Sequence, residues 1–293
     1  MHEKRVAVLG ATSLVGECLL PLLVRDGWRV MALSRRKIDR KDGSIEWQRL
    51  DKESLKPENY QGGESISHCI CLAPLWVLSD YLDLFAMLKI RRLVVLSSTS
   101  RFTKDTSSDP EEQAVARRLA EAEMLLQTWG ESHGVEWVIL RPTLIYGLGR
   151  DKNIAEIARF IRRFGFFPLC GRASGLRQPI HAQDVATVCL SALQEPAAAN
   201  RAYNVSGGET LNYCTMVARV FRAMGRSPRL VSIPLFVFRM ALVLPQFLPR
   251  YRHVTASMAE RMNRDLVFDH KEAALDLAFK PRTFVLSEGD VVV

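Results

Sequence analysis

A run of hydroxyl side chains follows a short apolar stretch near the middle of the chain. Ser97, Ser98 and Thr99 come directly after Arg92–Leu96, an apolar run with the length of a buried strand. In open α/β sheets, ligands bind beyond the carboxyl ends of the strands. We therefore expect these hydroxyls to face a ligand and to be placed for hydrogen bonding or proton transfer. A polar strand end without a chemical role fits the same pattern equally well.

A turn near the N-terminus has the residues and spacing of an anion site. Val6–Leu9 predicts a buried parallel strand, and a helix with one apolar face begins at Leu14. The start of such a helix presents free N–H groups and a positive dipole end to a phosphate. Gly10 permits a sharp turn, and Gly16 lets the helix pack closely on the strand. The predicted contacts with a dinucleotide pyrophosphate are Gly10, Thr12, Ser13, Leu14, Val15 and Gly16.

Ser13 stands where a regular pattern of this kind has another glycine. Its Cβ limits how closely the backbone can approach a pyrophosphate, although its hydroxyl could replace a lost contact. Serine is also a favoured N-cap, here for the helix that begins at Leu14. The two roles are compatible.

The end of the second expected strand indicates which dinucleotide is bound. Arg29–Ser34 is followed by Arg35 and Arg36, and no acidic residue occupies this position. An acid there would accept hydrogen bonds from the ribose 2′-hydroxyl, whereas arginine accommodates a 2′-phosphate. The pattern predicts NADP, with NAD as the second choice, and Ser34, Arg35 and Arg36 as contacts. The alternative is a solvated basic loop.

Three further strand ends complete the predicted cofactor site. The expected strands are Ile45–Leu50, which leads to an acid suited to the adenine amino group, Ser67–Leu72, and Trp137–Leu140. Together with the first hydroxyl after Arg92–Leu96, the residues at these ends would lie along one edge of a parallel sheet. The remaining predicted cofactor contacts are Asp51, Leu72, Ala73, Pro74, Ser97, Pro142 and Thr143.

Composition limits the class of protein. The 293 residues suffice for a large α/β domain with a smaller lobe, and 48% hydrophobic with 25% charged residues is typical of a globular protein. The net charge of +8 favours an anionic partner, but no nucleic-acid motif occurs. Six cysteines lie mostly in apolar runs, without metal-site spacing. With no signal peptide before the first strand, we expect a cytoplasmic protein with free thiols and no metal.

Two further segments carry expectations. Asp184 precedes the apolar helix expected at Val185–Leu193, so it is the expected N-cap. Residues 235–248 contain the most apolar run outside the expected sheet, bounded by prolines and too short to cross a bilayer. A buried helix of the small lobe explains this run, and a helix that binds a membrane surface or a protein partner is the alternative.

Several motifs recur along the chain in the order of a known family. Together they resemble the NAD(P)-dependent epimerase/dehydratase family, of the extended or atypical kind, within the short-chain dehydrogenase/reductase superfamily, and the resemblance covers nearly the whole chain. The motifs are Gly10-Ala11-Thr12 with Gly16, Ser97-Ser98, Glu121-Ala122-Glu123, Arg141-Pro142-Thr143 with Tyr146-Gly147, and Arg177-Gln178-Pro179-Ile180-His181 with Asp184.

The resemblance implies a doubly wound parallel (Rossmann) α/β sheet with a small, mostly helical C-terminal lobe. The Rossmann domain would cover residues 1–165 with a return segment 176–208, and the lobe 209–293 with 166–175. The implied substrate is a nucleotide-sugar or a similar small molecule, and a homodimer is possible in such a family. Thr99 would contact the substrate, and Arg172 and Arg177 could clamp its phosphate, unless their loop only packs on itself.

The family's acid/base pair is absent from the expected place. Enzymes of this family use a Tyr-x-x-x-Lys pair on the helix after strand five, and alignment on Glu121-Ala122-Glu123 puts Val115 and Leu119 there. Ser98 matches the family's catalytic serine or threonine, and Tyr146 is a nearby phenol in sequence. Both are candidate catalytic residues. Two hypotheses follow: an oxidoreductase or epimerase with a non-standard site, or an inactive dinucleotide-binding module for assembly, sensing or regulation.

Overall fold

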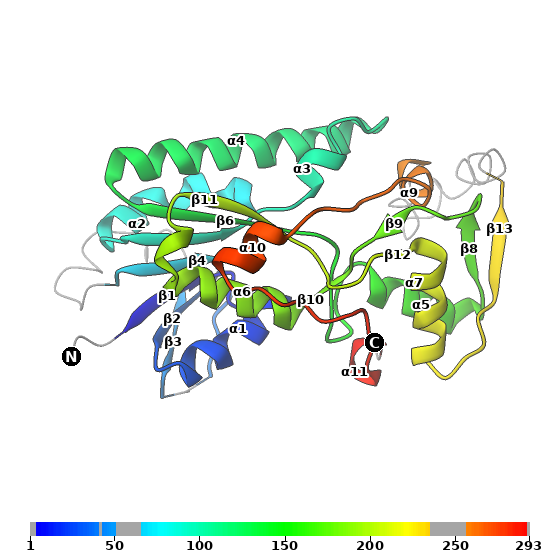
Figure 1. Ribbon diagram of the computed structural model, residues 1–293. Helices are drawn as coiled ribbons and strands as arrows, with labels where there is room; N and C mark the ends of the chain where they lie inside the picture. The colour runs from blue at the N-terminus through cyan, green and yellow to red at the C-terminus, as the bar shows by residue number, and fades with distance from the viewer. Residues whose placement is uncertain (1–3, 41–42, 51–65, 235–255, 292–293) are drawn as a thin grey trace.

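The computed structural model describes residues 4–40, 43–50, 66–234 and 256–291. Asp51 and the whole segment 235–248 lie outside these residues, so the expectations placed on them stay predictions. The described chain forms a large sheet with helices on both faces, beside a smaller lobe that holds α5, α7, β8 and β13 (Figure 1).

Seven parallel strands make the large sheet, in the order β11-β6-β5-β4-β1-β2-β3. Contiguous apolar runs form its centre, as in parallel sheets that are covered on both faces. The second and fifth expected strands have the predicted bounds, and the others differ at their ends by one to three residues. The strands are β1 (Arg5–Leu9), β2 (Arg29–Ser34), β3 (Ile45–Arg49), β4 (His68–Cys71), β5 (Arg92–Leu96), β6 (Glu136–Pro142) and β11 (Arg201–Val205).

Helices cover the two faces of this sheet and bury alternate residues of its strands. Val6 and Val8 face the core beneath α1 (Leu14–Arg25) and α6 (Ala182–Gln194). Ala7 and Leu9 face the opposite core, beneath the 3₁₀ helix η2 (Leu75–Tyr81), α2 (Leu82–Met87) and α4 (Pro110–His133). This alternation confirms the predicted doubly wound α/β fold.

The start of α6 corrects one expectation. His181, rather than Asp184, is the N-cap: its imidazole accepts a hydrogen bond from the N–H of Gln183 at 3.0 Å. Asp184 lies inside the first turn, where its carboxylate binds the guanidinium of Arg282 at 2.8 Å. The helix therefore begins earlier than predicted, and the acid joins α6 to a distant segment.

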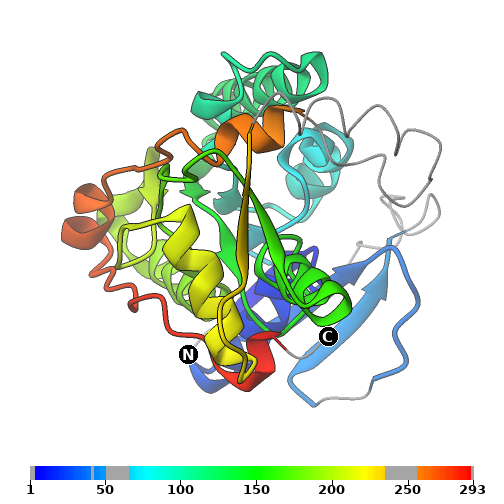
Figure 2. The ribbon, with the colours of Figure 1, turned by 90° about the vertical axis from the view of Figure 1, so that its right-hand side faces the viewer.

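The smaller lobe has a core of its own. Ile157 and Ile161 of α5 (Ile154–Phe164) pack with Val217 and Phe221 of α7 (Tyr213–Ala223). Three short strand pairs accompany these helices: β7 (Ile145–Tyr146) with β10 (Ile180–His181), β9 (Leu176–Arg177) with β12 (Leu211–Asn212), and β8 (Phe167–Cys170) with β13 (Leu230–Ile233). Helix α5 was expected within the first domain, but its apolar face belongs to this core. Figure 2 views the lobe end-on.

The last described segment returns from the lobe to the large sheet and back. Helix α9 (Ala256–Arg261) lies in the lobe, whereas α10 (Lys271–Asp276) packs on β11, and Phe279 enters the core beneath α1 and α6 (Figure 1). Helix α11 (Glu288–Val291) then rejoins the lobe, where Asp290 accepts a hydrogen bond from the N–H of Leu148 at 3.1 Å. Residues 209–293 thus serve both parts of the molecule, not the lobe alone.

All six cysteines are described and none forms a disulfide, and five of them are buried. Among the described residues no helix has the length and apolar character needed to cross a membrane. Nor do the described histidine, cysteine and acidic side chains form a cluster that could hold a metal ion.

The packing at Gly16 yields a stability prediction. A Cβ at this position would lie 2.3 Å from the carbonyl oxygen of Ala11, so the turn and the helix would have to separate. Although alanine has the better helix propensity by about 1 kcal/mol, we expect Gly16→Ala to lower the free energy of unfolding in urea by about 1–3 kcal/mol. Gly43→Ala, whose Cβ would meet no atom within 4 Å, is the control and should be nearly neutral. Equal stability of the two variants would contradict the packing argument.

Candidate functional site

The turn after β1 requires glycine at its first position. Gly10 has a φ of +80°, and a Cβ there would lie 2.7 Å from the nitrogen of Ala73 and 2.9 Å from the carbonyl carbon of Leu72. The N–H of Leu72 donates to the carbonyl of Leu9 at 2.8 Å, which brings the ends of β4 and β1 together. Pro74 follows, exposed to solvent. The predicted contacts Gly10, Leu72 and Ala73 therefore meet at one edge of the sheet.

The helix that follows begins with a side-chain cap. The hydroxyl of Ser13 accepts a hydrogen bond from the N–H of Gly16 at 3.1 Å, so Ser13 is the predicted N-cap. The first N–H groups of α1, at Leu14 and Val15, begin the helix and have no acceptor one turn earlier. They can receive an anion at the positive end of the helix dipole. The turn has the local geometry of a pyrophosphate site.

Two exposed cations follow the end of β2. Arg35 and Arg36 are solvent-exposed, and the buried hydroxyl of Ser34 accepts a hydrogen bond from the N–H of Arg36 at 3.1 Å. The charge of Arg35 acts on Tyr81 of η2, whose pKa is raised chiefly by burial and lowered by this arginine. Tyr81 was not among the predicted contacts. Its place beside Arg35 depends on the pairing of β1 with both β2 and β4.

The hydroxyls after β5 lie where the sequence predicted, at the carboxyl edge of the sheet. Thr99 is held to β6: its N–H and its hydroxyl donate to the carbonyl of Pro142 at 3.1 and 3.2 Å. The hydroxyl of Ser98 accepts from the N–H of Ser100 at 3.1 Å, at the start of α3 (Ser100–Thr103). The hydroxyl of Thr143 donates to the carbonyl of Gln178 at 2.5 Å.

A cavity of about 440 Å³ opens at this edge, between the sheet and the smaller lobe. Ser98, Thr99 and Thr143 line it from the sheet, and Arg177 and Tyr213 line it from the lobe. The structure thus brings together residues predicted for substrate, cofactor and chemistry. The remaining lining residues are Ser100, Thr103, Lys104, Leu144, Ile145, Asn153, Gln178, Arg261, Met262, Leu266 and Phe268.

Arg177 is buried, and its guanidinium is engaged by backbone. It donates to the carbonyls of Leu176 and Arg264 at 2.7 Å, and also to that of Arg261. Burial lowers the pKa of Arg177, and its guanidinium lies 5.5 Å from the ring centre of Tyr213. Arg177 therefore holds the lobe together while it faces the cavity. Arg172 is exposed and does not line the cavity.

Tyr146 lies in the core of the lobe and not in the cavity lining. It is fully buried, packs edge-on against His181 and Phe284, and donates to the carbonyl of Val285 at 3.4 Å. Burial raises the pKa of its phenol far above the ordinary value. A phenol in this setting is a poor proton donor to a ligand in the cavity, so the predicted catalytic role of Tyr146 gains no support from its position.

A buried carboxylate behind the cavity was not predicted as a site residue. Glu123 of α4 is 1% exposed and forms ion pairs with Arg101 and, at 2.7 Å, with Arg141. It also accepts a hydrogen bond from the hydroxyl of Ser97 at 2.5 Å. Phe102 covers the two guanidinium groups, with its ring centre 5.4 and 5.3 Å from their carbons. Glu123 therefore connects α4 to α3 and to the ends of β5 and β6.

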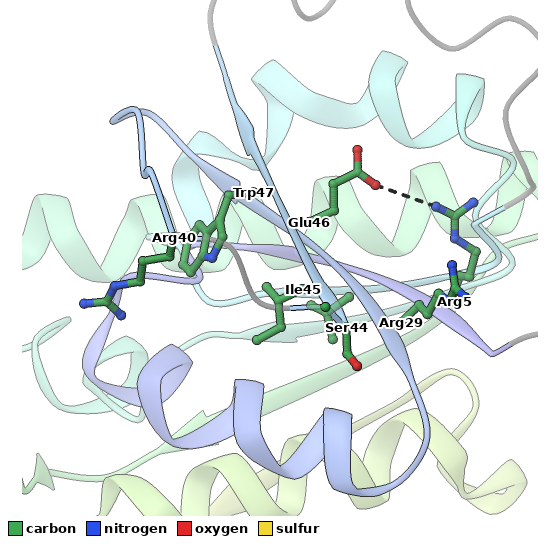
Figure 3. A pocket seen from close by; sticks show the side chains of 9 residues that line it. Arg5, Arg29, Arg40, Ser44, Ile45, Glu46 and Trp47 are labelled. Atoms are coloured by element: carbon green, nitrogen blue, oxygen red, sulfur yellow. Dashed lines mark ion pairs between the residues drawn. The ribbon is translucent and has the colours of Figure 1, made fainter.

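A second cavity, of about 410 Å³, lies on another part of the sheet (Figure 3). Arg5 and Arg29, at the amino ends of β1 and β2, line it together with Arg40 and Trp47. Arg5 and Glu46 form an ion pair of 3.9 Å across its rim. Because ligands of such sheets bind at the carboxyl ends of the strands, this cavity does not belong to the candidate site.

The network around Glu123 gives the second prediction. Glu123→Gln would leave two guanidinium groups sharing one neutral amide, and breaking a buried ion pair costs about 3–5 kcal/mol. We expect a loss of this size in the free energy of unfolding, measured in urea. Glu121→Gln, on the exposed side of the same helix, is the matched control and should change it by less than about 0.5 kcal/mol. A small effect at both positions would contradict the structural role of Glu123.

Known proteins resemble this chain in sequence and in fold. Residues 78–206 match the model of the NAD dependent epimerase/dehydratase family. The UDP-glucose 4-epimerase of Vibrio cholerae is 22% identical over 138 residues, which are 47% of this chain and 42% of that protein. The chain thus matches less than half the length of that relative.

Two solved structures share the fold over almost the whole chain. One is the UDP-glucose 4-epimerase of Thermotoga maritima with UDP-glucose, with a TM-score of 0.70, 15% identity, and 94% and 93% of the two chains covered. The other is the UDP-glucuronic acid 4-epimerase of Bacillus cereus in complex with NAD, with a TM-score of 0.72, 13% identity, and 98% and 95% covered. The family match and the shared fold confirm that this chain resembles the NAD dependent epimerase/dehydratase family, as its motifs predicted.

Proposed function

We propose that this protein binds a nicotinamide dinucleotide along the carboxyl edge of its sheet and holds a nucleotide-sugar or a similar small molecule in the adjoining cavity. The observation that carries the proposal is the turn from Gly10 to Gly16. There the backbone has no room for a Cβ at either glycine, and Ser13 caps a helix whose first N–H groups are free to bind an anion. Family relatives that bind NAD and UDP-sugars support the same assignment.

NADP is the proposed dinucleotide, with NAD second. Arg35 and Arg36 are exposed at the end of β2, where the ribose of an adenosine would lie. Guanidinium groups bind phosphate oxygens through paired, charge-assisted hydrogen bonds. Ser34 fixes the backbone of Arg36, which favours a defined loop over a freely moving one. The loop could therefore hold a 2′-phosphate.

The chemistry proposed for the cavity is a redox or epimerisation step without the family's usual acid/base pair. The nicotinamide ring, when bound, supplies the capacity to give or take a hydride. Ser98 lines the cavity and would hydrogen-bond an oxygen of the ligand. Val115 and Leu119 occupy the positions of the family's tyrosine and lysine, and Leu119 is buried in the core beneath α4. These apolar side chains can neither donate nor accept a proton.

The burial of Leu119 and Tyr146 also supports the alternative, a binding module that holds the dinucleotide without turnover. In either case we propose a protein of a reducing compartment such as the cytoplasm, because its six cysteines are unpaired. We also propose a homodimer, because Met124 and Leu125 are exposed apolar residues on α4.

Cofactor choice provides the third prediction. Arg35→Asp removes a phosphate-binding cation, and a hydrogen bond to a charged group is worth about 1.5–3 kcal/mol, so NADP should bind roughly 10- to 150-fold more weakly. NAD should bind almost as before, because it lacks the 2′-phosphate. Calorimetry with both dinucleotides measures the two effects. Lys37→Asp makes the same change of charge two residues away and is the control. Wild-type protein that binds NAD as tightly as NADP would contradict the assignment.

Turnover provides the fourth prediction. General acid–base catalysis contributes about 10²- to 10⁴-fold where it operates, so its absence should leave NADPH oxidation by simple aldehydes and ketones slow. The change in absorbance of NADPH measures the rate. Ser98→Ala should lower any residual rate, whereas Tyr146→Phe, which removes only a buried hydroxyl, should not. Brisk turnover that survives the combined removal of both hydroxyls would show that another group does the chemistry.

A further inference from the structure

We propose that the cavity takes a ligand with an acidic group, a carboxylate or a phosphate, which binds between Lys104 and Arg261. The inference deepens the proposed function and rests on it only for the rest of the ligand. It names the charge that the substrate carries at the end of the cavity formed by the α3–α4 connection and α9. Neither cation belongs to the motifs of the sequence.

The lining of the cavity has one sign of charge. Lys104 follows α3, Arg177 lies in β9 and Arg261 ends α9, so three separate elements each contribute a cation. No aspartate or glutamate is among the described side chains that line the cavity. Walls of one sign raise the local concentration of ligands with the opposite charge. The cavity therefore favours an anion.

One neighbouring carboxylate serves two of these cations. Glu112 forms an ion pair with Arg261, lies 3.8 Å from the ammonium of Lys104, and accepts a hydrogen bond of 2.7 Å from the hydroxyl of Ser107. Asp109 is near, but its carboxylate accepts the hydrogen bond of the Glu111 N–H that caps α4. One carboxylate between two cations leaves a positive charge that is not balanced within the cluster.

The two cations also disfavour each other, which an anionic ligand would relieve. Burial and the charge of Arg261 together lower the pKa of Lys104. The side chains of Lys104 and Arg261 are 25% and 23% exposed, so both reach the cavity without being free in solvent. Arg177 adds charge, but its guanidinium already binds backbone carbonyls. Lys104 and Arg261 are therefore the groups that can meet an acidic group directly.

The other lining residues fit a ligand with a hydroxylated ring. Ser98, Ser100, Thr103 and Asn153 offer neutral hydrogen-bonding groups, and Phe268 with other apolar side chains forms the opposing wall. A sugar ring presents hydroxyl groups at its edge and C–H groups on its faces. Within the proposed nucleotide-sugars, the structure thus favours those whose sugar carries an acid. Sugar phosphates share the same recognition chemistry.

The experiment measures the acetylation rate of the Lys104 amine by N-acetoxysuccinimide, followed by peptide mass spectrometry. We expect millimolar glucuronate or inorganic phosphate to slow the reaction at least about threefold, as a ligand at twice its dissociation constant would. Glucose and sodium chloride at matched ionic strength should not slow it. Lys271, whose side chain is 84% exposed, is the internal control and should react equally in all conditions. Glucuronate acting alone would assign a carboxylate, and phosphate acting alone a phosphate.

Two variants test the same site by another measurement. Arg261→Met should abolish the protection while Lys104 still reacts. In calorimetry, wild-type protein should prefer UDP-glucuronic acid over UDP-glucose by about tenfold, or about 1.4 kcal/mol, and Lys104→Met should remove this preference, whereas Lys271→Met should keep it.

The outcomes separate this inference from the proposed function. Protection by glucuronate or phosphate without binding of either UDP-sugar would reject the nucleotide-sugar and retain the acidic site. Binding of both UDP-sugars with equal affinity, without protection of Lys104 by either small anion, would overturn the acidic site and retain the nucleotide-sugar.

Discussion

The buried carboxylate of Glu123 is the interaction on which the geometry of the site depends. An unpaired carboxylate in the interior costs several kcal/mol, so this one is stable only while Arg101, Arg141 and Ser97 remain in contact with it. Those partners come from α3 and from the ends of β5 and β6. The requirement to satisfy one charge therefore fixes where the hydroxyls of Ser98 and Thr99 lie relative to Thr143. Apolar packing alone would tolerate small shifts among the same elements.

Positive charge gathers at two places along the carboxyl edge of the sheet. Arg35 and Arg36 lie after β2, towards one edge of the sheet, and Lys104 and Arg261 lie beyond β5 on the other side of β1. Between them is the turn at Gly10, whose anion-binding capacity comes from backbone N–H groups. Side chains thus supply charge at the two ends, and backbone supplies it in the middle. The net charge of +8 has at least part of its origin in this arrangement.

Local patterns predicted the strands and the first turn well. Arg29–Ser34 and Arg92–Leu96 are contiguous apolar runs with polar ends, so their bounds follow from composition. The cap of α6 was missed because His181 and Asp184 are both able to cap, and Arg282, 98 residues from Asp184, decides between them. The roles of Lys104 and Arg261 depend on a fold contact between segments that no local pattern connects. Tyr146 looked available in sequence because only the third core reveals its burial.

The chain passes between the sheet and the lobe several times, and this limits how the cavity can admit a ligand. Strand β6 leads into β7, β9 and β10 lead into α6, β11 leads into β12, and the segment after α9 returns to the sheet before α11. A single hinge would have to bend all these connections together. Rigid-body opening of the two parts is therefore costly, and exchange through the motion of individual lining side chains, on much shorter time scales, is the expected route.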